Sequence, residues 1–137
     1  MPFPFMSDGW IEEARALRDQ LRTAVHELGV EISMNVAMTD CPLPGAPSSL
    51  YIEVSDGTVT FDVGRLPAAD VDLTVAYPVA KEVLLSGSME RALHEIVMGT
   101  IEVDGDFEKL LEFGGLMATD GALVTAEIGR RLSCFTS

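Results

Sequence analysis

Apolar residues recur along the chain at two spacings, which predict helices and strands in turn. A spacing of three and four residues predicts a helix that begins near Ser7 or Asp8 and ends at Gly29, a residue type that often terminates helices. The apolar face of this helix would consist of Trp10, Ile11, Ala14, Leu17, Leu21, Val25 and Leu28. Strict alternation follows directly and predicts a strand with Val30, Ile32, Met34, Val36 and Met38 on one side.

Four further alternating stretches extend this strand to a predicted sheet of five. Asp56-Gly57 strongly favours a two-residue hairpin turn between the second and third strands, and the proline-rich stretch 41–49 before them predicts a loop. The apolar positions of the second to fifth strands are Leu50, Ile52 and Val54; Val59, Phe61 and Val63; Val71, Leu73 and Val75; and Ile101 and Val103. Each strand is apolar on one side only, which is typical of a mainly antiparallel sheet with one face in water and the other under helices.

The polar positions of the strands are expected to face solvent. On the first strand these are Glu31, Ser33 and Asn35, and Asp70 and Asp72 flank Val71 in the same way on the fourth. Nothing in the alternation assigns these side chains a partner.

Helical spacing returns in the second half of the chain. Tyr77-Pro78 opens a short helix that Gly87 ends, and Ser88, Asp106, and Thr119 or Asp120 can cap three more. The apolar positions of these three helices are Met89, Ala92, Leu93, Ile96 and Val97; Phe107, Leu110, Leu111, Phe113, Leu116 and Met117; and Leu123, Val124, Ile128, Leu132 and Phe135. The middle one is apolar around most of its girth, so it either lies between the sheet and another helix or faces a cavity. Gly114-Gly115 is expected to break it.

These elements predict a single α+β domain over residues 1–137: a five-stranded, mainly antiparallel sheet with one face covered by about five helices. The charge is strongly acidic, with 9 basic against 22 acidic residues and a net charge of -13. Such a charge repels phosphate backbones, which excludes nucleic acid as a favoured partner, and it opposes adhesion to anionic membranes. No signal peptide and no run of about 18 apolar residues is evident, so we expect a cytoplasmic protein without stable membrane insertion.

Residue patterns that carry chemistry are missing from the sequence. Cys41 and Cys134 lack the spacing of a zinc or redox site, and neither His26 nor His94 lies near a cysteine in the sequence. Asp104-Gly105-Asp106 reads as a turn with a helix cap rather than a calcium loop. We therefore expect no catalytic residue, no metal and no cofactor.

One stretch of the chain resembles the sterol carrier protein type 2 family of small lipid-binding domains. The resemblance rests on ADVDLTV at residues 69–75, LLSGS at 84–88, Ala92, and MGTIEVDGD at 98–106, in the order and spacing of the family. The close match covers about residues 69–118, while the leading helix and the hairpin agree in order only.

The resemblance implies that the helices and the sheet enclose an apolar tunnel. It implies non-catalytic binding or carriage of an apolar lipid, which could be a fatty acid, acyl-CoA, phospholipid or sterol. The tunnel would lie between the sheet and the helices of residues 77–118. Its expected lining is Val83, Leu84, Leu93, Ile96, Val97, Leu110, Phe113 and Met117.

Two alternatives to a lipid carrier stay open. One is an accessory or dimerisation module whose apolar cleft receives a partner segment or a second copy, so a homodimer is not excluded. The other, a hotdog-like thioesterase, fits less well because several helices cluster in the second half. Residues 120–135 form either a lid over the pocket or an ordinary core helix, with Glu127 placed to pair with Arg131.

Overall fold

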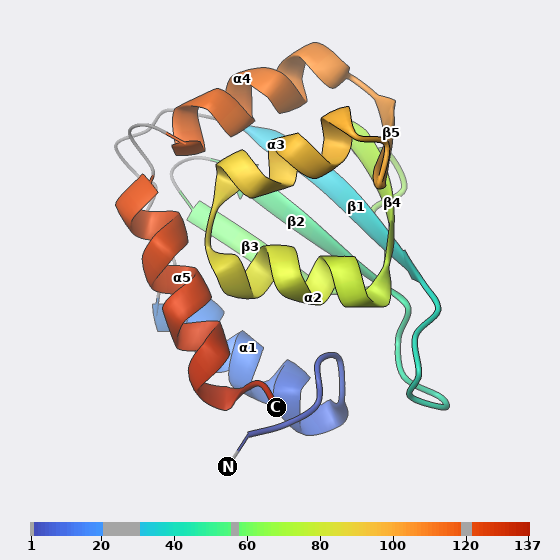
Figure 1. Ribbon diagram of the computed structural model, residues 1–137, viewed down its shortest axis with the longest axis vertical. Helices are drawn as coiled ribbons and strands as arrows, with labels where there is room; N and C mark the ends of the chain where they lie inside the picture. The colour runs from blue at the N-terminus through green and yellow to red at the C-terminus, as the bar shows by residue number, and fades with distance from the viewer. Residues whose placement is uncertain (1, 21–30, 56–57, 119–121) are drawn as a thin grey trace.

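The computed structural model describes residues 2–20, 31–55, 58–118 and 122–137 (Figure 1). These residues form five helices and five strands in the α+β arrangement that the spacing predicts. In chain order the elements are α1 (Asp8–Gln20), β1 (Ile32–Thr39), β2 (Ser49–Ser55), β3 (Thr58–Val63), β4 (Val71–Ala76), α2 (Tyr77–Ser86), α3 (Met89–Val97), β5 (Ile101–Gly105), α4 (Phe107–Ala118) and α5 (Ala122–Phe135). The rest of the predicted first helix, the Asp56-Gly57 turn and the caps at 119–120 lie outside the described residues.

The five strands form one sheet in the order β3-β2-β1-β4-β5. All neighbours pair antiparallel except β1 and β4, which are parallel because the chain returns from the β2–β3 hairpin to the free side of β1. The prediction of a five-stranded, mainly antiparallel sheet is therefore confirmed. Figure 1 shows α2 and α3 crossing in front of the sheet, with α4 along one end and α5 along one side.

The outer face of the sheet is less wet than the alternation predicts. Asn35 is 2% exposed, because its side-chain amide donates to the carbonyl of Leu66 and to Asp72 and its oxygen accepts from the Leu66 amide. Asp70 accepts hydrogen bonds from the amide and hydroxyl of Ser33. The hydrogen bond from the Ser33 amide lowers the pKa of Asp70 below its ordinary value. The side chains of Asp70 and Asp72 are 33% and 44% exposed, in line with the prediction that they are solvated, but both also accept hydrogen bonds from β1.

The predicted helix ends are confirmed where the structure describes them. Gly87 adopts a left-handed conformation after α2, with φ of 62°. The Ser88 hydroxyl accepts from the Arg91 amide at the start of α3, and the Asp106 carboxylate accepts from the Lys109 amide at the start of α4.

The glycine pair in α4 does not break the helix as predicted. α4 runs without interruption from Phe107 to Ala118. Gly114 is buried, and a Cβ there would lie 2.9 Å from Cδ2 of Leu93 on α3. Its missing side chain lets the two helices approach closely, which helical spacing alone does not reveal.

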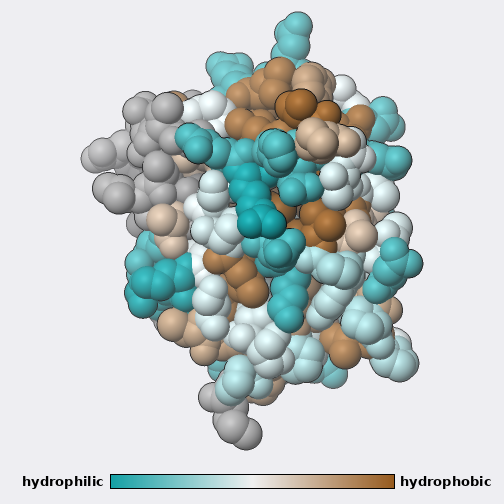
Figure 2. All heavy atoms as spheres, viewed as in Figure 1, coloured by the Kyte–Doolittle hydropathy of each residue, from teal (hydrophilic) through white to brown (hydrophobic). Residues whose placement is uncertain are grey.

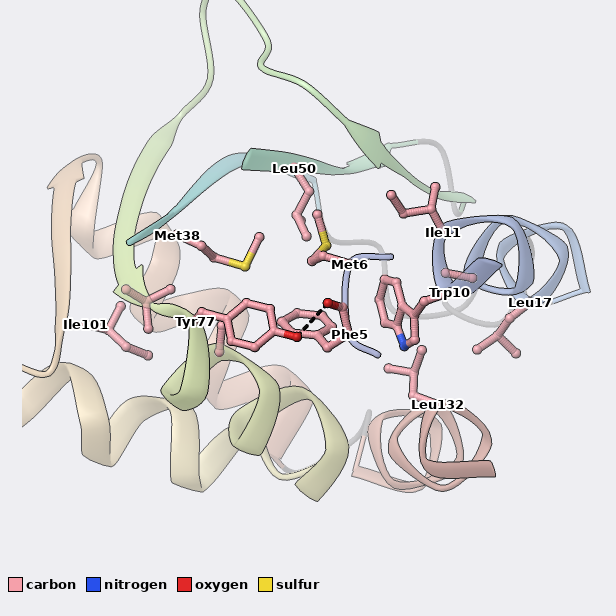
Figure 3. Close-up of a cluster of buried hydrophobic side chains, with 13 residues drawn as sticks. Phe5, Met6, Trp10, Ile11, Leu17, Met38, Leu50, Tyr77, Ile101 and Leu132 are labelled. Atoms are coloured by element: carbon pink, nitrogen blue, oxygen red, sulfur yellow. Dashed lines mark hydrogen bonds between the residues drawn. The ribbon is translucent and has the colours of Figure 1, made fainter. Parts of the chain in front are cut away.

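The two ends of the chain lie side by side (Figure 1). Phe3 forms a parallel bridge with Thr136, through hydrogen bonds from the Phe3 amide to the Phe135 carbonyl (2.7 Å) and from the Ser137 amide to the Phe3 carbonyl (2.8 Å). The N-terminal segment then enters the core, where the carbonyl of buried Phe5 accepts a hydrogen bond from the Tyr77 hydroxyl (Figure 3).

Candidate functional site

A cavity of about 250 Å³ lies between the inner face of the sheet and the helices. Its floor is built from apolar side chains of β1, β2 and β3: Met34, Leu50, Ile52, Val54, Val59, Phe61 and Val63. The helical walls contribute Val83, Leu84, Met89, Ala92, Phe113, Met117, Ile128 and Leu132. One end is formed by α1 and the segment before it, through Met6, Trp10, Ile11, Ala14 and Leu17.

Strand register explains the apolar floor. Met34 pairs with Ile52 across β1 and β2, and Ile52 pairs with Phe61 across β2 and β3, so the three side chains form one row. Leu50 and Val63 form a second row in the same way. Because side chains alternate between faces, each apolar position of the pattern falls on this side of the sheet.

Four of the eight predicted lining residues lie in the cavity wall, namely Val83, Leu84, Phe113 and Met117. The other four lie elsewhere. Leu93 packs against Gly114, Leu110 is buried in a neighbouring cluster around Ile32 and Val71, Ile96 packs between the two core clusters, and Val97 is 81% exposed. Helical spacing marks an apolar face but does not distinguish contact with a cavity from contact with another helix.

The α1 end of the cavity was missed because the resemblance directs attention to residues 77–118. Figure 3 shows Trp10 and Ile11 reaching from α1 toward Met6 and Leu132, which closes this end with residues from both termini. The Trp10 ring meets Phe5 edge-on at 4.8 Å, and its indole N–H donates to the Thr136 hydroxyl at 2.8 Å. The apolar stripe of the first helix was visible in the sequence, but its position over the cavity was not.

Three charged side chains, Arg15, Arg18 and Asp62, are found among the lining residues at the same end. Nε and Nη2 of Arg15 donate to Oδ1 of Asp62 at 3.0 and 2.6 Å. Nη1 of Arg18 donates to Oδ2 of Asp62 at 3.3 Å and to the Phe61 carbonyl at 3.0 Å. Their side chains are 42%, 23% and 28% exposed, so the cluster sits at the boundary between the cavity and water.

Two carboxylates balance the two guanidinium groups of this cluster, because Nε of Arg18 also donates to Oδ1 of Asp19 at 3.3 Å. Burial raises the pKa of Asp62, but the hydrogen bond from Arg15 and the bond from the Val63 amide outweigh it, so the pKa lies below its ordinary value. Asp62 is therefore ionised at neutral pH and satisfies only part of the donor capacity of the two guanidinium groups. Asp19 uses one more of these donors, and those that remain could accept a further anion.

The described residues offer no candidate metal site. They contain no cluster of three or more potential metal ligands. Cys41 is half-buried, whereas Cys134 and His94 are exposed on separate helices. His26 lies outside the described residues. None of the helices described is long and apolar enough to cross a bilayer.

The architecture defines a class, that of α+β domains with an apolar cavity between one sheet face and the helices that cover it. Comparison with solved structures places the chain within this class: it has the fold of sterol carrier protein 2. The crystal structure of sterol carrier protein 2 superposes with a TM-score of 0.57 at 17% identity, covering 90% of this chain and 98% of that one. The ubiquinone synthesis protein UbiJ-SCP2 gives 0.56 at 16% identity, covering 89% and 97%. The resemblance stated from residues 69–118 is thus confirmed at the level of the fold.

Two further solved structures are similar to this chain over part or most of its length. Palmitated SCP2L2 from Aedes aegypti superposes with a TM-score of 0.50 at 18% identity, covering 82% of this chain and 95% of that one. A sec-alkylsulfatase from Pseudomonas is 27% identical over 63% of this chain, which spans only 13% of the sulfatase's length, and its TM-score is 0.46. No protein-family model and no curated protein sequence matches the chain.

Proposed function

We propose that this protein binds one lipid with a single acyl chain and an anionic head group, and does not transform it. The observation that carries the proposal is the composition of the cavity wall. Among the residues that the structure describes, the wall is apolar apart from Ser88 and the charged side chains of Arg15, Arg18 and Asp62. An apolar interior with a few polar groups that fix orientation is typical of ligand sites.

The size of the cavity favours a slender ligand. About 250 Å³ is close to the lower end of the roughly 300–1,000 Å³ of small-molecule sites. A single acyl chain suits this space better than a sterol ring system or the two chains of a phospholipid. Each buried methylene contributes about 0.8 kcal/mol, so affinity should rise about fourfold per carbon until the chain fills the space.

The charged cluster sets the expected orientation of the lipid. Guanidinium groups bind carboxylates through paired, charge-assisted hydrogen bonds. A fatty-acid carboxylate at Arg15 and Arg18 would leave its chain running between the β1–β3 floor and the wall formed by Phe113 and Met117. The palmitate of the structurally similar Aedes protein is consistent with such a ligand.

Trp10 provides a direct measurement, because it is the only tryptophan and lies in the cavity wall. Titration with a bromine-labelled stearate should quench its fluorescence, and native mass spectrometry should show one lipid per chain. A folded protein that neither quenches nor retains lipid would refute the proposal. An affinity that does not depend on the length of the acyl chain would contradict the cavity as the binding site.

The head group is tested separately by comparing stearic acid with its methyl ester. We expect Arg15→Gln to lower affinity for the acid about tenfold while changing that for the ester little, because the lost interaction is charge-assisted. Arg65→Gln is the matched control, since Arg65 makes one ion pair with Asp72 on the outer face of the sheet. Equal binding of acid and ester to the unmodified protein would refute the anionic head group while leaving lipid binding intact.

A further inference from the structure

Four large apolar side chains remain in water on the outer side of α3 and α4. Val97 is 81% exposed, Met98 66%, and Phe107 and Leu111 44% each. We call these four residues the α3–α4 patch. Figure 2 shows apolar surface gathered at the top of the molecule, where Figure 1 places α4 and the end of α3. Single exposed apolar residues are ordinary, but a contiguous group marks an interaction site.

Helix packing makes the patch contiguous. α3 and α4 run side by side in opposite directions (Figure 1), and the absence of a side chain at Gly114 lets Leu93 pack against α4. The end of α3 at Val97 therefore lies beside the first turns of α4. Phe107 and Leu111 are four residues apart and so share one stripe of α4, next to the seam between the helices.

The stretch of chain that carries this patch is rich in carboxylates. Residues 89–112 contain seven acidic residues (90, 95, 102, 104, 106, 108 and 112) and two basic ones (91 and 109), so this stretch contributes 7 − 2 = 5 of the 13 net negative charges. Glu108 and Glu112 are exposed and form the stripe next to Phe107 and Leu111.

The two basic side chains of residues 89–112 do not pair with the carboxylates of the same stretch. Arg91 pairs with Glu82 at 3.2 Å, and Lys109 pairs with Asp70 at 3.1 Å. Both partners lie outside residues 89–112, on α2 and just before β4. The exposed carboxylates of Glu108 and Glu112 on α4 therefore present their charge to solvent beside the patch, whereas Glu102 and Asp104 of β5 lie on the outer face of the sheet with Thr74 and Asp72.

We propose that the α3–α4 patch binds a basic amphipathic helix of a partner protein. The apolar face of such a helix covers Val97, Phe107 and Leu111. Its lysines and arginines meet the carboxylates beside them on α4, a recognised mode of helix binding. A second copy of this chain would bring the same carboxylates against each other across a two-fold axis. An anionic lipid surface would be repelled by the same charges. This site is distinct from the cavity, and its occupancy does not depend on lipid.

The probe is a fluorescent peptide of about four helical turns with leucines on one face and lysines on the other. Fluorescence anisotropy should show binding of this peptide and none of its glutamate-for-lysine counterpart. Val97→Ser with Leu111→Ser should weaken binding about tenfold or more, because the apolar contact is lost without a change in charge. Glu108→Gln with Glu112→Gln should weaken it and reduce its dependence on salt.

Matched controls decide between this site and general attraction to an acidic protein. Glu13→Gln with Glu53→Gln removes the same charge from exposed positions on α1 and β2, and should leave the affinity within about twofold. An equal loss in both glutamate pairs, or no loss in the serine pair, overturns the proposal. Two other results would also overturn it: the protein forms a dimer in sedimentation, or it binds phosphatidylcholine vesicles, and the serine pair abolishes that association. In either case the patch would have another occupant. Thermal unfolding verifies that each variant is folded.

Discussion

Glycine-to-alanine substitutions in two helices test how closely α5 packs against α2. Alanine favours a helix interior over glycine by about 1 kcal/mol, so intrinsic propensity predicts that both Gly115→Ala and Gly129→Ala stabilise the protein. The structure predicts opposite signs. In the described part of the chain nothing lies within 4 Å of a Cβ built at Gly115. We therefore expect Gly115→Ala to raise the free energy of unfolding by about 1 kcal/mol.

Gly129 is in a different position, because α5 approaches the end of α2 at this residue. A Cβ at Gly129 would lie 2.5 Å from Cα and 2.6 Å from N of Gly87, and 3.0 Å from the carbonyl oxygen of Leu85. These are backbone atoms, and Gly87 is held in a left-handed conformation, so no side-chain rotation relieves the contact. Forced separation of packed elements costs about 1–3 kcal/mol or more, which exceeds the gain in propensity.

We therefore expect Gly129→Ala to lower the free energy of unfolding by up to about 2 kcal/mol, once propensity is set against overpacking. Urea unfolding followed by far-UV circular dichroism measures both variants at once. Gly129→Ala should also weaken lipid binding, because Ile128 and Leu132 on the same helix line the cavity. If Gly129→Ala stabilises the protein as much as Gly115→Ala does, the close approach of α5 to α2 is wrong.

Three further outcomes follow from other contacts. Asn35→Ala should cost about 1–3 kcal/mol in urea unfolding, because it leaves polar groups of Leu66 without partners in a buried site, and a neutral result would contradict that burial. The lowered pKa of Asp62 contributes stability that is present above its unfolded pKa and lost as the pH falls through its folded value. The stability difference between the wild type and Asp62→Asn should therefore shrink as the pH falls below about 5, whereas a constant difference would show that Arg15 does not depress that pKa. Deletion of residues 136–137 should leave the far-UV circular dichroism unchanged and speed the exchange of bound lipid, as measured by stopped-flow fluorescence. An unchanged exchange rate would show that these residues do not restrict access to the cavity.

The spacing of apolar residues predicts most of the helices and strands, because alternation and helix caps depend on residues that are close together in the sequence. Alternation located β2 to β5, and side-chain caps located the starts of α3 and α4. Asn35 shows where such reasoning ends. It occupies a polar position of an alternating strand, yet it is buried because a segment 31 residues away folds over it.

The site is less predictable because it is assembled from distant segments. Arg15 and Asp62 meet at the cavity across 47 residues of chain, and neither belongs to a motif. In α5, spacing suggested Arg131 as the partner of Glu127 and did not point to Arg130, whose Nε and Nη2 donate to Glu127 at 3.0 and 2.6 Å. On an exposed helix such alternatives differ by only a few tenths of a kcal/mol, so sequence alone does not decide between them.

From Ile128 onward, α5 has the contacts of a core element, which bears on how lipid enters the cavity. Leu132 is buried against the α1 end, and Gly129 packs against the backbone of α2. The segment around Met6 is held differently. Met6 lines the cavity with a left-handed φ of 71°, a conformation that costs free energy in a residue with a side chain. Hydrogen bonds at Phe3 and Phe5 hold this segment, and some of their partners are the last residues of the chain. A short strained segment held by a few end contacts opens at lower free energy than a helix packed along its length. We therefore expect the paired chain ends, rather than α5 as a whole, to control access to the cavity.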